Sequence, residues 1–159
     1  MANFNNNIIK TDDEYMTTLE TWESIKDYIP KDKIIWEAFY GDGTSGSNLE
    51  SLGFDVIHKP INFFDNDEGD IVVSNPPFSK SEQIFDRLFE LDKPFILLLP
   101  ITKYFNKNFT KYRNKNIQLI RPDGRISYIK NGKLEKSPSF HSMFYCYKMN
   151  LPNDMIWLN

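Results

Sequence analysis

The sequence predicts an α/β fold with a doubly wound, mostly parallel sheet that finishes in antiparallel strands. Three observations predict it. Short apolar runs alternate with amphipathic segments over the first hundred residues. The run at 94–100, PFILLLP, is apolar throughout, as expected for a strand buried on both faces. The last third holds strand-like runs joined by Asp-Gly and Asn-Gly turns. At 159 residues, we expect one domain spanning 1–159.

The elements follow in order along the chain. Residues 1–11 are polar and predict a flexible tail. The segment 13–29 has apolar residues at helical spacing and predicts a helix. Thr17 with Glu20 forms a capping-box signature at its start, and Pro30 is expected to end it. Strands are then expected at 33–39, 54–58, 71–74 and 94–100, and helices at 45–52 and 81–91.

Three further strands are expected in the last third, at 117–121, 125–130 and 141–149. Asp123-Gly124 and Asn131-Gly132 supply hairpin turns between and after them. Because hairpins join antiparallel strands, this region predicts the antiparallel end of the sheet. We expect no separate recognition domain within these residues.

Composition excludes several classes of protein. The single cysteine, Cys146, excludes an internal disulfide framework, and with only two histidines no metal-ligand cluster can be proposed. We find neither a run of membrane-spanning length nor a signal peptide, so we expect a soluble, intracellular, cytoplasmic protein without a membrane partner. The many Asn, Lys and Ile residues suggest an AT-rich coding sequence, such as that of a virus or phage.

Charge divides unevenly along the chain, although the net charge is only −3. Residues 1–100 contain 19 acidic and 8 basic residues, whereas residues 101–159 contain 3 acidic and 11 basic residues. Such a division is expected of a protein with one face that meets an anionic partner, and equally of one with a merely solvated basic surface.

The first motif with chemical content is EAFYGDG, residues 37–43, between an expected strand and helix. In a doubly wound sheet, ligands bind outside the carboxyl ends of the strands, and glycines there let the backbone approach a ligand closely. With Gly46, the stretch GDGTSG also matches the G-x-G-x-x-G pattern of dinucleotide-binding turns. A plain strand-to-helix turn would need the same glycines.

The second motif is Asn75-Pro76-Pro77-Phe78, directly after the strand at 71–74. Proline has no backbone donor and a fixed φ, so the strand must end there in a rigid corner. A tetrapeptide of this kind is expected by chance in about 1% of chains of this length. The alternative is a proline-stiffened turn with Asn75 as an ordinary turn former.

With both motifs in this order, the chain resembles the class I S-adenosylmethionine-dependent methyltransferases of the N6-adenine type, including small phage and viral enzymes that act on DNA. The resemblance covers about residues 12–149 and implies a Rossmann-like fold with S-adenosylmethionine as cofactor and no metal. It also implies that the Asn75 side-chain oxygen and the Pro76 carbonyl accept the hydrogens of the target amine. Pro77 would stiffen the turn, and Phe78 would offer a ring for the base to stack on.

The same resemblance implies which residues bind the cofactor. The segment EYMTT would close over its methionine end, and the acidic-glycine turn and the segment after the second strand would line the rest. The implied residues are Tyr15, Thr17, Glu37, Phe39, Tyr40, Gly41, Gly43, Asn62, Phe63 and Asn75. Two positions depart from the family pattern. The segment 56–59, which includes His58, has no carboxylate where an acid normally binds the ribose. Asn62 stands where an Asp is usual, so either Asn62 or Asp65 would contact the cofactor adenine. The missing acid also argues against NAD.

A basic, aromatic segment at 102–115 completes the prediction. Its lysines recur every four residues and would form one stripe on a helix, as a phosphate-tracking surface or as an ordinary solvated face. The expected substrate-binding residues are Phe78, Lys80, Lys103, Lys107, Lys111 and Arg113. The partner is then a nucleic acid, DNA in preference to RNA, with a partner subunit or homodimer left open. Protein-glutamine methylation, and a non-catalytic subunit of the same fold, remain as alternatives.

Overall fold

The computed structural model describes residues 15–159, so the tail expected at 1–11 lies outside the described part of the chain. The elements, in chain order, are β1 (Met16–Thr17), α1 (Leu19–Glu23), η3 (Lys26–Tyr28), β2 (Ile34–Trp36), α2 (Thr44–Ser51), β3 (Asp55–Ile57), η4 (Phe63–Asp65), β4 (Ile71–Ser74), η5 (Phe78–Lys80), α3 (Ser81–Glu90), β5 (Phe95–Pro100), α4 (Thr102–Phe105), η6 (Lys107–Tyr112), β6 (Gln118–Arg121), β7 (Tyr128–Lys130), β8 (Lys133–Glu135), β9 (Ser142–Tyr147) and β10 (Met155–Trp157).

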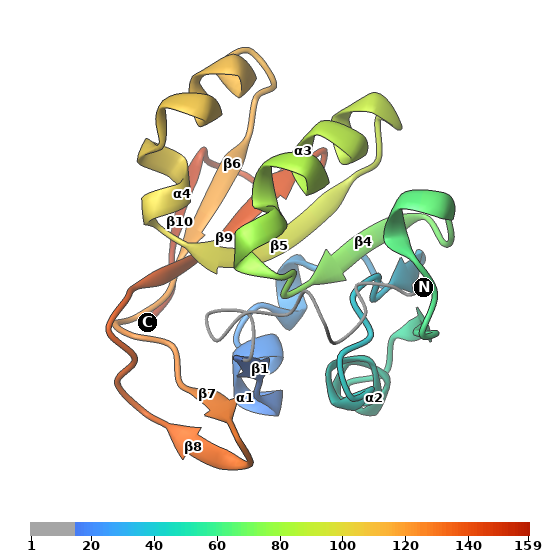
Figure 1. Ribbon diagram of the computed structural model, residues 1–159, viewed down its shortest axis with the longest axis vertical. Coiled ribbons are helices and arrows are strands. Elements are labelled where there is room, and N and C mark those ends of the chain that lie inside the picture. Colours follow the sequence, from blue (N-terminus) through green and yellow to red (C-terminus); the bar gives the residue numbers. More distant parts are fainter. Residues whose placement is uncertain (1–14) are drawn as a thin grey trace.

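A seven-stranded sheet forms the centre of the molecule, in the order β10-β6-β9-β5-β4-β2-β3 (Figure 1). Its strands are parallel except for β9, which runs antiparallel between β5 and β6. A second, three-stranded antiparallel sheet consists of β1, β7 and β8. The fold class predicted from the sequence, a Rossmann-like, doubly wound, mostly parallel sheet with antiparallel strands in the C-terminal third, is confirmed: β9 is antiparallel in the large sheet, and β7 and β8 are antiparallel in the small one.

Helices cover both faces of the large sheet, because its central strands are apolar on both sides. In β5, Ile96 and Leu98 face the cluster that contains Trp22 of α1 and Leu49 of α2. The alternate residues of that strand face the cluster built on α3 and η6. In Figure 1, α3 and α4 accordingly lie on one side of the sheet and α1 and α2 on the other. Every residue of β5 is buried, as the apolar run PFILLLP predicts.

Four sequence-based expectations about the elements are wrong. The helix expected within 13–29 is shorter, because α1 ends at Glu23 and a separate 3-10 helix, η3, follows it. The side-chain cap of the first helix is Thr18, whose hydroxyl accepts from the Thr21 N–H, whereas Thr17 lies in β1. Asp123-Gly124 does not join a hairpin, since β6 and β7 belong to different sheets. The basic segment is not one helix: α4 ends before Asn106, whose ψ of 141° is extended, and a 3-10 helix follows.

The Asn131-Gly132 turn is confirmed. Both residues have positive φ, 53° and 77°, and they form the two-residue connection between β7 and β8. The strand β8 itself was not expected, and neither were β1 and β10. Among the described residues, no helix combines the length and apolarity needed to cross a bilayer. No group of three or more potential metal ligands occurs among the residues that the structure describes.

Candidate active site

The two sequence motifs meet at the carboxyl edge of the large sheet. β2 pairs with β4, so the glycine turn that follows β2 and the Asn-Pro-Pro-Phe turn that follows β4 start from neighbouring strands. A direct contact joins them: the Ser74 hydroxyl, at the end of β4, donates to the Glu37 carboxylate, just after β2. The two turns of the candidate active site are therefore connected at the carboxyl edge of the sheet, where ligand sites in such folds commonly lie.

Glu37 is the buried centre of this edge, with 1% of its surface exposed. Its carboxylate accepts from Ser74, from the Ser45 hydroxyl at 2.6 Å and from the Phe39 N–H at 3.1 Å. Burial raises the pKa of the Glu37 carboxyl to about 7, although these three hydrogen bonds lower it. The predicted cofactor residue Glu37 thus lies beneath the glycine turn and ties β2, β4 and α2 together.

The side chains of Tyr40 and His58 pack closely against glycines of the glycine turn and of the start of α2. Gly41 and Gly43 have positive φ, 61° and 85°. A Cβ at Gly43 would lie 2.8 Å from the Tyr40 hydroxyl, and one at Gly46 would lie 2.3 Å from Cγ of His58. Packing within the protein therefore accounts for the second and third glycines of the G-x-G-x-x-G pattern, without a dinucleotide.

His58 occupies the position after β3 where the family pattern has a ribose-binding acid. Its ring stacks on Tyr40, with 6.1 Å between ring centroids and 17° between ring planes. Its Nε2 lies 3.1 Å from Oε1 of Glu50 on α2. The fold thus brings a carboxylate to this corner from α2, which sequence analysis did not identify because Glu50 lies on a different element from the expected acid.

Asn62 and Phe63 are placed by the short helix η4. The Asn62 side-chain oxygen accepts from the Phe64 N–H at 2.8 Å, so this oxygen caps the helix. Phe63 is completely buried, stacks on Trp36 at 5.6 Å and contacts Phe39 at 4.9 Å between ring centroids. The structure brings the predicted cofactor residues Phe39 and Phe63 together, as part of the core beside the site.

Asn75 has a fixed orientation. Its Nδ2 donates to the backbone carbonyl of Tyr15 at 2.7 Å. Because a carbonyl can only accept, the atom facing it must be the amide nitrogen. The side-chain oxygen of Asn75 therefore points the other way, and it is buried with no hydrogen-bond partner among the described residues. A buried acceptor without a partner costs about 1–3 kcal/mol, and its presence calls for an explanation.

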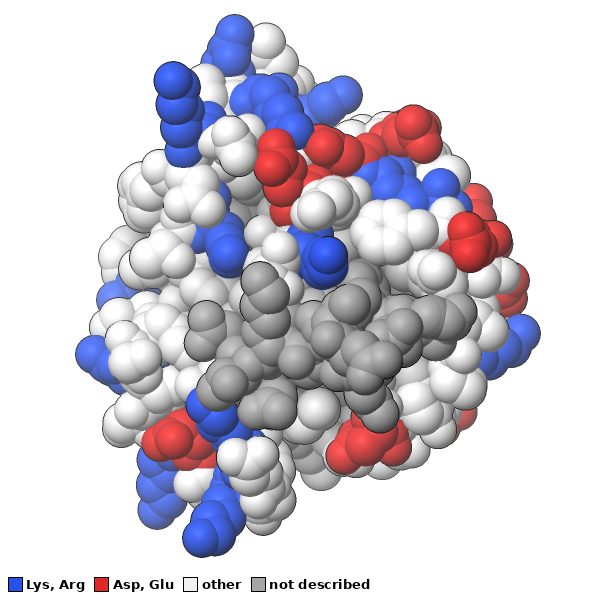
Figure 2. Space-filling view, in the orientation of Figure 1, with Lys and Arg blue, Asp and Glu red and all other residues white. Residues whose placement is uncertain are grey.

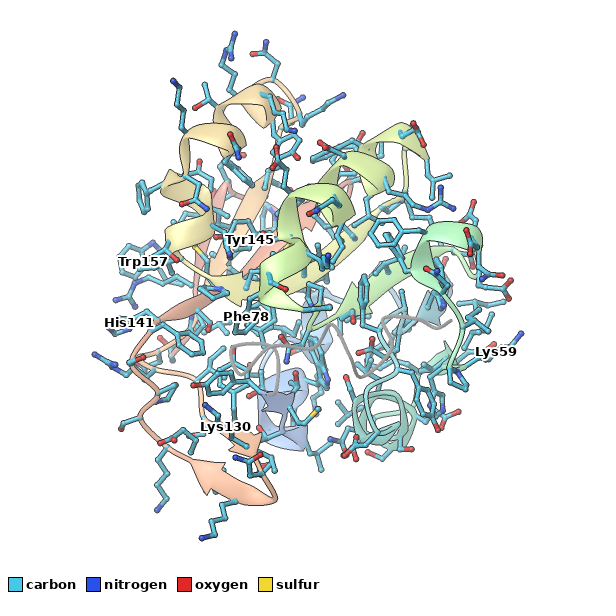
Figure 3. The ribbon with its side chains drawn as sticks, in the orientation of Figure 1. Lys59, Phe78, Lys130, His141, Tyr145 and Trp157 are labelled. Atoms are coloured by element: carbon cyan, nitrogen blue, oxygen red, sulfur yellow. The ribbon has the colours of Figure 1, made fainter. Side chains whose placement is uncertain are left out.

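Phe78 is 6% exposed and lies inside an aromatic cluster. The Tyr15 ring stacks on it, with 6.1 Å between ring centroids and 16° between ring planes, and Phe140 contacts it edge-on at 5.5 Å. Lys130 of β7 donates from Nζ to the Tyr15 hydroxyl at 3.2 Å and lies 4.5 Å from its ring centroid. Figure 3 shows Phe78 near the middle of the molecule and Lys130 below it. A base that stacks on Phe78 would have to displace Tyr15 or stack beside it.

The predicted lysine stripe is not a single surface. Lys111 pairs with Glu82 at 2.8 Å and with Asp86 at 3.0 Å, and these contacts raise its pKa. The helix α4 ends before Asn106, so Lys103 lies on a different helix from Lys107 and Lys111. Arg113 donates to the Thr110 carbonyl at 3.1 Å. Figure 2 shows basic side chains at the top of the molecule, with a group of acidic side chains beside them.

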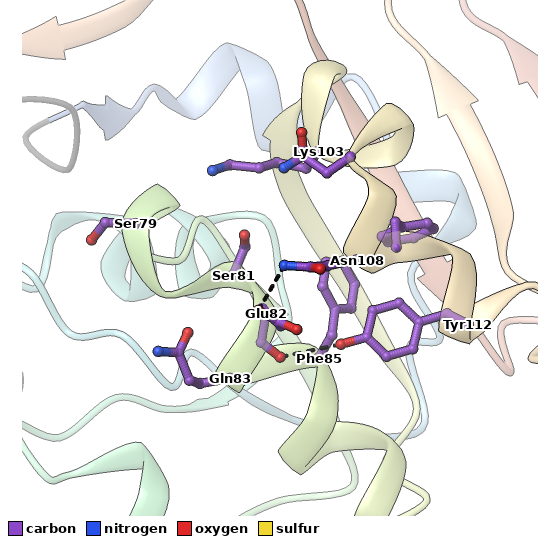
Figure 4. A pocket seen from close by; sticks show the side chains of 10 residues that line it. Ser79, Ser81, Glu82, Gln83, Phe85, Lys103, Asn108 and Tyr112 are labelled. Carbon is purple, nitrogen blue, oxygen red and sulfur yellow. Dashed lines mark hydrogen bonds between the residues drawn. The ribbon is translucent and has the colours of Figure 1, made fainter.

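A pocket of about 250 Å³ lies beside the Asn-Pro-Pro-Phe turn, between α3 and the α4–η6 segment (Figure 4). It begins at Ser79, the residue after Phe78, and takes in Lys103 from the basic segment. The sequence predicts Lys103 near the substrate but does not reveal the pocket, because the walls of the pocket come from two segments, 79–85 and 103–112, that are separate in the sequence.

Comparisons with known proteins add little to this geometry. No family model matches the chain, and no curated protein matches it. Among solved structures, the crystal structure of a "putative RNA methyltransferase" from Pyrococcus horikoshii aligns with 80% of this chain and 78% of that chain, at 16% identity and a TM-score of 0.40. A likeness at this level carries no conclusion about the activity of this chain.

Proposed function

We propose that this protein is an S-adenosylmethionine-dependent methyltransferase that acts on the N6 amine of adenine in nucleic acid, in DNA rather than RNA. The observation that carries the proposal is the orientation of Asn75 at the carboxyl edge of the sheet. Its Nδ2 is held by the Tyr15 carbonyl, which leaves a buried oxygen acceptor without a partner. An exocyclic amine would supply the missing donor.

The chemistry requires acceptors of this kind. The lone pair of an exocyclic amine is conjugated with the ring, so the amine is a weak nucleophile. Hydrogen bonds from its two hydrogens to the Asn75 oxygen and the Pro76 carbonyl favour the tetrahedral geometry that frees the lone pair. Transfer would form the N–C bond while the S–C bond of the donor breaks with its electron pair left on sulfur, and the additional proton on nitrogen would leave to solvent. Alignment of the reactants supplies much of the acceleration.

The cofactor would supply an electrophilic methyl group, and the residues that could hold it surround the glycine turn. Gly41 is exposed at the edge of the sheet, close to Tyr40, and Tyr40 in turn stacks on His58 of the Glu50–His58 pair. The buried acceptor of Asn75 lies across the same edge, joined to the turn through Ser74 and Glu37. This arrangement fits a ligand that reaches from the glycine turn to the Asn-Pro-Pro-Phe turn.

The test is methyl transfer from labelled S-adenosylmethionine to separate pools of DNA, RNA and protein. We expect label in DNA, and we expect Asn75→Ala to abolish transfer with little change in cofactor affinity. Asn114→Ala, at an exposed asparagine, is the matched control. Label in RNA or at protein glutamine would replace the proposed substrate. Retained activity in Asn75→Ala would contradict the role of the amide.

A second candidate is a non-catalytic subunit that keeps this fold to bind nucleic acid or a partner chain, including a second copy of itself. Two observations favour it: Tyr15 covers the ring of Phe78, and His58 replaces the ribose-binding acid. Calorimetry with S-adenosylmethionine separates the candidates. Absence of binding at millimolar cofactor would support the non-catalytic subunit and contradict the enzyme.

A further inference from the structure

The pocket beside the Asn-Pro-Pro-Phe turn has the chemistry of a nucleotide site. Its lining residues come from the turn, from the first two turns of α3, and from α4 and η6 across from them (Figure 4): Ser79, Ser81, Glu82, Gln83, Phe85, Lys103, Asn106, Asn108, Phe109 and Tyr112. At about 250 Å³, it is slightly smaller than the pockets that hold drug-sized ligands, and so suits a single nucleotide or base.

The floor of the pocket is aromatic and fixed. Phe85 is 1% exposed, and its ring contacts Phe109 edge-on at 5.3 Å and Tyr112 at 5.5 Å. The Tyr112 hydroxyl donates to Oδ1 of Asp86 at 2.6 Å, which ties η6 to α3. Phe85 and Tyr112 are themselves buried and support Phe109, which is half-buried, so a base entering the pocket would meet the Phe109 ring, and base–aromatic contacts are a principal source of affinity for single strands.

The charge inside the pocket favours an anionic strand. Its one acidic side chain, Glu82, accepts from Nδ2 of Asn108 at 3.1 Å and from Lys111 at 2.8 Å, so its charge is compensated within the protein. Lys103 is half-buried, extends over the pocket in Figure 4, and makes no ion pair among the residues that the structure describes. A phosphate group is the partner that this lysine lacks.

Three amide side chains, Gln83, Asn106 and Asn108, stand exposed among the lining residues, and Asn108 already donates to Glu82. Each carries both a donor and an acceptor, the combination that pairs with the edge of a base and discriminates among bases. A lysine alone would bind any phosphate, whereas amides beside an aromatic floor can distinguish one base from another.

The position of the pocket relates it to the target site. Ser79 follows Phe78 directly, so the pocket opens next to the corner where the target adenine would lie. We propose that this pocket holds the nucleotide adjacent to the target adenine, with its phosphate at Lys103 and its base edge at Gln83 and Asn106. This inference rests on the proposed function and places a source of sequence preference within this domain.

The test measures binding of short single-stranded oligonucleotides by fluorescence anisotropy, with one central adenine and each flanking position varied in turn. We expect the wild-type dissociation constant to differ about tenfold among bases at one flanking position, and the Gln83→Ala/Asn106→Ala variant to reduce this difference to about twofold. Lys103→Gln should weaken binding of all sequences alike and reduce the slope of log K against log salt by about 0.7. Lys133→Gln, at an exposed lysine of β8, is the matched control and should leave the slope unchanged.

The outcomes separate this inference from the proposed function. If the base preference of the double variant equals that of the wild type, or if the wild type binds none of the oligonucleotides, the pocket is not a nucleotide site. If Lys103→Gln and Lys133→Gln have the same salt slope, the phosphate contact is wrong. If both variants behave as expected and the wild type transfers no methyl group to any nucleic acid, the pocket stands and the proposed enzyme activity falls.

Discussion

Replacing Glu37 by Gln should change how the stability of the protein depends on pH. Glu37 is buried beneath the glycine turn and accepts hydrogen bonds from Ser45, Ser74 and the Phe39 N–H. Glutamine has the same shape and can accept from the Phe39 N–H and donate to the Ser45 hydroxyl. It cannot ionise, so the variant removes the titration of this site and keeps most of its packing.

The expected size of the effect follows from the pKa of the Glu37 carboxyl, which burial raises from its ordinary value of 4.5 to about 7. The folded protein binds this proton more tightly than the unfolded chain. The contribution of Glu37 to stability is therefore complete below pH 4.5 and is lost as the pH rises through about 7. At about 1.4 kcal/mol for each pKa unit, roughly 2 to 3 kcal/mol is lost between pH 5 and pH 8.

Urea unfolding of both proteins at pH 5 and pH 8 measures this effect. We expect the free energy of unfolding of Glu37→Gln, relative to wild type, to rise by roughly 2 to 3 kcal/mol from pH 5 to pH 8. Titrations elsewhere are common to both proteins and cancel in the difference. Glu135→Gln, at an exposed glutamate of β8, should follow the wild type. If the difference for Glu37→Gln is the same at both pH values, Glu37 does not titrate between them and the argument from burial is wrong.

Three further predictions concern other contacts of the site and its supports. Asn75→Asp replaces the donor that faces the Tyr15 carbonyl by a carboxylate, so methyl transfer should fall at least about tenfold at pH 8. The rate should recover as the pH is lowered, because a protonated carboxyl can donate again. A variant-to-wild-type rate ratio that does not change with pH would contradict this. Gly46→Ala places a Cβ against the His58 ring and should lower the free energy of unfolding by about 1–3 kcal/mol, and the same change in a His58→Ala background should cost much less. Lys93→Met leaves two backbone carbonyls without their donor and should lower the free energy of unfolding, measured in urea, by about 2–4 kcal/mol. If the free energy of unfolding falls no more than it does when an exposed lysine is replaced by Met, these contacts contribute little.

The central strands and the helices that cover them could be predicted from the sequence because their signals are local. A fully apolar run such as 95–100 can be stable only where both faces of a strand are covered, and the amphipathic segment at 81–90 has one face to bury. Gly53, with a φ of 99°, directly follows the C-cap of α2, the position where a left-handed glycine commonly ends a helix. In each case the residues that form the element also specify it.

The errors arose where distant contacts decide the structure. The lysine spacing at 103–115 fits a helix, but the backbone is extended at Asn106, and beyond it Lys111 pairs with two carboxylates of α3. Asp123-Gly124 has the composition of a hairpin turn, yet the strand after it leaves the large sheet to pair with β1. Turn propensity predicts the turn correctly in such cases, but it does not predict which strand the next strand will pair with.

The contact that orients Asn75 belongs to this second kind. The Tyr15 carbonyl reaches Asn75 because β1 pairs with β7, Met16 opposite Ile129 and Thr17 opposite Tyr128. That pairing in turn brings Lys130 onto the Tyr15 ring. Sixty residues separate the two partners of the hydrogen bond, and the strand that positions one of them comes from the last third of the chain. The Asn-Pro-Pro-Phe turn therefore supplies the Asn75 amide. The small sheet, whose β7–β8 hairpin contains an Asn-Gly turn, determines the direction in which the amide oxygen points.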